Sequence, residues 1–127
     1  MKIPDPARRE RQRVLIEKGI EAPFFRDHIK VHDEAVAEME AQLKKTKWLA
    51  CNEYTLADAI MTPYIERADR LGLAGLWENR PSVADWFTRI KARPSFKAIS
   101  DYPPTDYDDT GRDGLKNWPR IKELIAA

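Results

Sequence analysis

Asp58 is the carboxylate whose position in the sequence predicts a specific role, which is to accept hydrogen bonds at the start of a helix. Thr55 and Asp58 have the S/T-x-x-D/E spacing of a capping box. In that motif the threonine hydroxyl accepts a hydrogen bond from the aspartate amide, and the carboxylate accepts one from the threonine amide. A buried helix start has N–H groups that water cannot reach, so losing the cap costs about 1 to 2 kcal/mol. The spacing therefore favours a structural role for Asp58 over a catalytic one.

The other reactive side chains are one cysteine and two histidines. Cys51 is the only cysteine, which excludes an internal disulfide and a cysteine-based zinc site within one chain. As a nucleophile it would need a base or a helix N-terminus beside it, and neither histidine is near it in sequence. His28 and His32 are four residues apart, but no third metal ligand lies in register with them. We therefore predict no catalytic residue and no metal site, and the cofactor-binding residues stay unknown.

A strongly apolar helix is expected directly after the capping box. Between residues 55 and 70 the first charge after Asp58 is Glu66, and apolar residues cover both sides of the helical cylinder. This pattern is typical of a helix surrounded by others. We therefore expect a central helix rather than a surface one, with a bend near Pro63, because proline removes one backbone hydrogen bond.

Prolines and a glycine mark two helices in the first third of the chain. Asp5 is followed by a proline, and Gly19 comes thirteen residues after that proline, so a helix is expected over residues 6–18. After Pro23, apolar residues recur at helical spacing among charged ones. This predicts an amphipathic helix that ends near residues 44–47.

Further helices are expected after residue 80. A helix over about 81–93 carries four apolar residues on one face, and Pro94 ends it and opens a short helix. The four residues are Val83, Trp86, Phe87 and Ile90. Residues 101–114 are rich in aspartate, proline and glycine and predict no regular element. Asn117 and Pro119 then suggest the start of a last helix that docks on the bundle.

Composition limits the class of protein. The 127 residues include 22 basic and 21 acidic ones, so no net field favours nucleic acid or an acidic membrane as a partner. No apolar run is long enough to span a membrane, and the first residues lack the apolar core of a signal peptide. We expect a single domain in a cytoplasmic protein, with no nucleic-acid or membrane partner.

Four segments resemble a known family. The run from Trp48 to Asp58, the apolar helix with Pro63, and the two Arg-Pro steps at Arg80 and Arg93 resemble the C-terminal all-α domain of glutathione S-transferases. The resemblance covers about residues 25–100, and it is closest to bacterial transferases of the β-etherase kind, in which a Pro-rich and Arg-rich segment similar to residues 3–23 of this chain precedes the same helices. It implies an all-α helical bundle. Its parts are an N-terminal helix and linker at 1–24, core helices at 25–100, and an acidic tail with a terminal helix at 101–127.

The family resemblance also implies two functions. Glutathione S-transferases bind glutathione in an N-terminal thioredoxin-like domain, and no βαβ pattern for such a domain occurs in this sequence. The first hypothesis is a domain that contributes hydrophobic-substrate binding and oligomer contacts and is not catalytic alone. The alternative is a non-catalytic protein–protein interaction module. Glutathione is the family's cofactor, but none is expected in this chain.

The expected partners follow from the same comparison. The chain resembles a bundle that lacks its first long helix and the neighbouring domain, so apolar side chains of the central helix and of the segment around Trp86 and Phe87 should be exposed. A second copy of the chain or a thioredoxin-like domain would cover them. A hydrophobic small molecule is the other expected partner.

Overall fold

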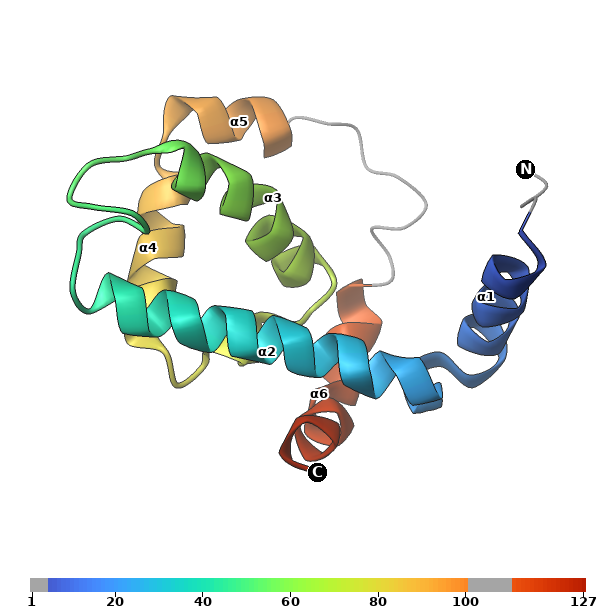
Figure 1. Cartoon of the computed structure of the whole chain (residues 1–127). Coiled ribbons are helices and arrows are strands. Elements are labelled where there is room, and N and C mark those ends of the chain that lie inside the picture. The colour runs from blue at the N-terminus through green and yellow to red at the C-terminus, as the bar shows by residue number, and fades with distance from the viewer. Residues whose placement is uncertain (1–4, 101–110) are drawn as a thin grey trace.

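The described part of the chain consists of helices with turns and loops between them (Figure 1). The computed structural model describes residues 5–100 and 111–127. No strand occurs in those two ranges, which confirms the all-α prediction. The elements, with η for a 3₁₀ helix, are α1 (Pro6–Lys18), η1 (Gly19–Glu21), α2 (Pro23–Leu43), α3 (Leu56–Arg70), η2 (Ala74–Trp77), α4 (Pro81–Lys91), α5 (Pro94–Ser100) and α6 (Gly111–Ala126).

The boundaries of the first two helices confirm the sequence prediction. The Asp5 carboxylate accepts a hydrogen bond from the Ala7 amide at 3.0 Å and caps α1. Gly19 ends α1 with φ of 53°, a conformation that glycine adopts at little cost. Helix α2 then runs to Leu43, close to the predicted end.

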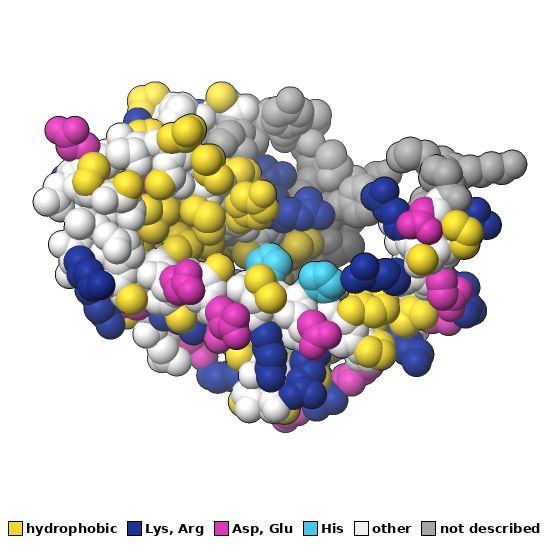
Figure 2. All heavy atoms as spheres, in the orientation of Figure 1, with side chains coloured by type: hydrophobic (Ala, Val, Ile, Leu, Met, Phe, Trp, Pro, Cys, Tyr) yellow, Lys and Arg dark blue, Asp and Glu magenta, His cyan; other side chains and the backbone are white. Residues whose placement is uncertain are grey.

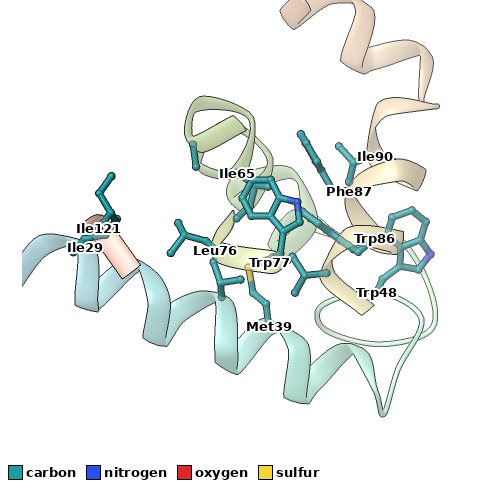
Figure 3. Close-up of a cluster of buried hydrophobic side chains, with 13 residues drawn as sticks. Ile29, Met39, Trp48, Ile65, Leu76, Trp77, Trp86, Phe87, Ile90 and Ile121 are labelled. Atoms are coloured by element: carbon teal, nitrogen blue, oxygen red, sulfur yellow. The ribbon is translucent and has the colours of Figure 1, made fainter. Parts of the chain in front are cut away.

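Helix α2 is the long element against which α4, η2 and α6 pack (Figure 1). Its buried apolar residues are Ile29, Val36 and Met39, which lie on one face at helical spacing. Figure 3 shows Ile29 beside Ile121 of α6 at one end of the core, and Met39 below Trp77 in the middle. The core therefore joins segments from both ends of the chain.

Helix α3 lies at the surface, so the prediction of a central helix surrounded by others is wrong. One face is buried and carries Asp58, Thr62, Ile65 and Ala68. The opposite face carries Leu56, Ile60 and Tyr64, which are 73%, 52% and 60% exposed. The sequence is apolar on both sides, but no described element covers the second side.

Trp86 and Phe87 of α4 are buried, at 0% and 3% exposure, so the expected exposure of this segment is also wrong. The Phe87 ring meets the Trp77 ring edge to face, with centroids 5.8 Å apart. Helix α4 packs against α2, α3 and η2. These contacts hide the aromatic face that the family comparison suggested would be open.

The last helix begins earlier than the sequence suggests. Helix α6 starts at Gly111, so the predicted start near Asn117 is wrong and Pro119 lies inside the helix. An interior proline costs about 3 kcal/mol, but Ile121 is buried to 1% exposure against the core and offsets this cost. A Cβ atom on Gly114 would lie 1.6 Å from the Leu71 carbonyl oxygen, so only glycine permits this close packing. Of the predicted irregular segment at 101–114, residues 101–110 lie outside the described residues, and residues 111–114 are helical, so that part of the prediction is wrong.

Two acidic side chains of α2 hold the start of α4. The Asp33 carboxylate pairs with the Arg80 guanidinium at 2.7 Å. About two helical turns further along α2, the Glu40 carboxylate accepts a hydrogen bond from the Val83 amide at 3.0 Å. That amide belongs to the first turn of α4 and has no partner within its own helix. Glu40 therefore caps α4 from a neighbouring helix.

The ionised form of Glu40 is favoured in the fold. Burial raises the pKa of the Glu40 carboxyl, but hydrogen bonds from the Val83 amide and the Ser82 hydroxyl, together with the Lys44 ammonium, hold it below the ordinary 4.5. The unfolded chain therefore takes up this proton first as the pH falls, and proton uptake favours unfolding.

We predict that part of the acid sensitivity of the fold comes from Glu40. The free energy of unfolding should fall as the pH drops through 4.5 toward the folded pKa, and Glu40→Gln should remove that part of the pH dependence. The exposed Glu38→Gln on the same helix should leave it unchanged. Urea unfolding from pH 7 to pH 3 measures both, and identical pH profiles for the two variants would contradict the assignment.

Candidate functional site

The Asp58 carboxylate is fully buried and receives hydrogen bonds from three segments. One oxygen accepts from the Leu49 amide at 3.0 Å and from the Trp86 indole N–H at 2.8 Å. The other accepts from the Thr55 amide at 3.0 Å. The Thr55 hydroxyl accepts from the Ala57 amide at 3.3 Å, and both halves of a capping box between Thr55 and Asp58 are formed.

These bonds fix how α3 is oriented. They tie its first turn to α4 through Trp86 and to the preceding turn through Leu49. Asp58, Thr62 and Ile65 must then face inward, because they lie at helical spacing on one face. The opposite face is held outward by the same contacts.

The outward face of α3 carries a row of large apolar side chains, which we call the α3 stripe. It consists of Leu56, Ile60 and Tyr64, at positions i, i+4 and i+8, and all three are more than half exposed. Figure 2 shows hydrophobic side chains gathered over α3, next to the two histidines of α2. The stripe holds no charged group, and the Tyr64 hydroxyl is its one polar atom outside the backbone. Such a surface suits an apolar ligand or partner.

The histidines and the cysteine are not assembled into a catalytic group. Each histidine Nδ1 lies near a backbone carbonyl oxygen of its own helix. The His28 Nδ1 is 2.5 Å from the Phe24 carbonyl oxygen, and the His32 Nδ1 is 2.9 Å from the His28 carbonyl oxygen. Cys51 is exposed, and its thiol donates to the Glu53 carbonyl at 3.5 Å. Within residues 5–100 and 111–127, no three His, Cys, Asp or Glu side chains are grouped so that they could hold a metal ion.

The fold and sequence together identify the family. The sequence model of the family 'glutathione S-transferase, C-terminal domain' matches residues 20–94, which is more than half of the chain. The chain therefore belongs to this family. No solved structure matches it significantly. None of the helices in the described part of the chain is both long and apolar enough to cross a membrane.

Curated relatives are similar at modest identity. Glutathione S-transferase GstB of Escherichia coli is 28% identical over 71 residues, which cover 56% of this chain and 33% of the relative. Glutathione S-transferase F13 of Arabidopsis thaliana is 41% identical over 61 residues, which cover 48% of this chain and 28% of the relative. Tetrachloro-p-hydroquinone reductive dehalogenase of Sphingobium chlorophenolicum is 29% identical over 66 residues, which cover 52% of this chain and 27% of the relative. The matches span a third or less of each relative.

Sequence reasoning expected apolar side chains of this helix to be exposed, and the exposure of Leu56, Ile60 and Tyr64 confirms that expectation, but it did not separate the exposed face from the buried one. The i, i+4, i+8 spacing of Leu56, Ile60 and Tyr64 marks one face of a helix. The same sequence places Asp58, Thr62 and Ile65 on the other face. The buried face holds two polar residues, so hydrophobicity alone does not distinguish it from the exposed face.

We predict that Asp58→Ala destabilises the fold by about 3 kcal/mol, because it leaves the Trp86 indole and two backbone amides without their acceptor. Asp69→Ala on the same helix removes an exposed carboxylate and should cost little. His28→Ala and Cys51→Ser should also cost little. Urea midpoints measure all four, and equal shifts would show that the Asp58 contacts do not stabilise the fold.

We predict that the isolated chain self-associates through the α3 stripe. Helix α6 docks on α2 and leaves the stripe exposed, and burying apolar area is favourable. Light scattering over a dilution series should show a mass that rises with concentration, and Ile60→Glu should return it to the monomer. Ile16→Glu on α1, at a site 85% exposed, is the matched control. A monomer at every concentration, with no binding of a hydrophobic dye, would contradict the prediction.

Proposed function

We propose that this chain is the substrate-binding part of a glutathione S-transferase-like protein and that the α3 stripe forms one wall of a pocket for a hydrophobic compound. The observation that carries the proposal is the exposure of Leu56, Ile60 and Tyr64 on a helix whose other face is anchored by Asp58. A binding wall needs apolar contact area on a rigid element, and the capped helix supplies it.

The chemistry of the stripe favours an uncharged, partly aromatic compound. Aliphatic side chains exclude water from such a ligand, and the Tyr64 ring offers a face for stacking together with one hydroxyl. One relative is named for its action on tetrachloro-p-hydroquinone, a chlorinated aromatic. A compound of that class fits an apolar wall with a single polar atom.

Glutathione enters the proposal through the family. The relatives are named glutathione S-transferases, and conjugation requires the thiol to be held beside its acceptor. In the proposed division of labour, a thioredoxin-like domain holds glutathione while this single domain, residues 1–127, holds the acceptor. Contacts with a second copy of the chain complete the assembly, which is expected in the cytoplasm.

The binding of an uncharged probe tests the proposed wall. N-phenyl-1-naphthylamine should bind the wild-type chain with increased fluorescence, and Ile60→Gln should weaken its binding several-fold because it removes apolar contact at the centre of the stripe. Ile16→Gln makes the same change on α1, at a site 85% exposed, and should not change the affinity. Equal affinities for the three proteins would overturn the proposal.

A second measurement separates this function from that of an interaction module. By calorimetry, glutathione should give no heat with this chain alone and should bind once a thioredoxin-like protein from the same cell is added. Glutathione binding by the chain alone would overturn the division of labour. A stripe that supports self-association but binds no apolar probe would instead identify a non-catalytic protein–protein interaction module.

A further inference from the structure

Two arginines near the end of α4 stack on aromatic rings of the turn that precedes α3. The Arg89 guanidinium carbon lies 4.5 Å from the centre of the Trp48 ring. The Arg93 guanidinium carbon lies 3.5 Å from the centre of the Tyr54 ring and 6.0 Å from that of Trp48. The two rings themselves meet edge to face at 5.4 Å. The four side chains thus form one half-buried cationic and aromatic cluster.

This cluster contains hydrogen-bond donors without acceptors. The Arg89 Nη1 and Arg93 Nε atoms are both buried and have no partner in the described residues. Arg89 still pairs through Nε with Asp85 at 3.0 Å. Among the carboxylates of residues 5–98 and 114–127, none forms an ion pair with Arg93. In that part of the chain the faces of the rings are what balances its charge, and a buried guanidinium donor left unpaired is unfavourable.

A cavity opens beside Arg93. Its volume is about 220 Å³, and its walls include the apolar side chains Ile90 and Phe96 and the hydroxyl-bearing Tyr54, Thr62 and Ser95. Pockets for drug-sized ligands begin at roughly 300 Å³, so this one suits a smaller molecule. Its lining residues do not include Leu56, Ile60 or Tyr64.

We propose that this cavity binds a small organic carboxylate with a compact apolar body. The Arg93 guanidinium pairs with the carboxylate, because a planar fork of N–H groups matches two carboxylate oxygens. The Tyr54 and Ser95 hydroxyls are additional donors, and Ile90 and Phe96 contact the apolar body. A single guanidinium without a carboxylate partner calls for one negative charge, which favours a monocarboxylate over phosphate.

Calorimetry with sodium benzoate on the full 127-residue chain tests this site. Benzoate should bind, and benzyl alcohol, which has nearly the same shape without the charge, should not. Arg93→Gln should weaken benzoate binding about tenfold or more, since a hydrogen bond to a charged group is lost. Lys91→Gln removes the same charge from an exposed position on α4 and should leave the affinity unchanged.

Two further measurements keep the test decisive if a variant is unstable. Arg93→Lys keeps the charge and loses the fork, and it should also weaken benzoate binding. In ¹H–¹⁵N spectra of the wild-type chain, benzoate should shift the amide signals of Tyr54 and Ser95 and leave those of Leu56 and Ile60 in place. The site is overturned if wild-type binds no benzoate at millimolar concentration, if it binds benzyl alcohol or inorganic phosphate as tightly, or if Arg93→Gln binds benzoate like wild-type.

Ile60→Gln separates this site from the proposed pocket wall. The substitution should weaken N-phenyl-1-naphthylamine binding and leave benzoate binding unchanged, because Ile60 does not line the cavity. Loss of benzoate binding in Ile60→Gln would place benzoate on the stripe and overturn the separate carboxylate site.

Discussion

The buried carboxylate of Asp58 is the contact on which the arrangement of the chain depends. It is the shared acceptor for the turn before α3, the first turn of α3 and the Trp86 side chain of α4. A buried carboxylate is tolerated only when hydrogen bonds replace its water, and here they come from three directions. The same carboxylate therefore sets the outward face of α3 and, through Leu49, the place of the turn that carries Trp48 and Tyr54.

A second set of polar contacts holds the start of α4. Glu40 and Asp33 reach from α2 to the Val83 amide and to Arg80. Removing one member of such a group leaves its partner buried and unpaired, which is far more costly than never having had the pair. Directed hydrogen bonds to buried charges thus fix α4 at its start and at its middle, and apolar residues pack between α2 and α4.

Local features of this fold could be predicted from sequence, and features that depend on distant partners could not. Asp5 and Gly19 act within one helix, so they give the bounds of α1 correctly. The exposure of Ile60, the burial of Phe87 and the early start of α6 depend on which elements lie opposite. The Arg93 cavity escaped notice for the same reason, since its walls come from the turn before α3, from α3 itself and from the α4–α5 junction.

The way α6 joins the core has a consequence for the order in which the molecule assembles. Ile121 packs beside Ile29, at the opposite end of the sequence (Figure 3), so docking α6 closes a loop of most of the chain. The contacts among α3, η2 and α4 span much shorter separations and carry a smaller loop-closure entropy. We therefore expect α6 to dock after α3, η2 and α4 have packed together, and its amide hydrogens to exchange with solvent before those of α4.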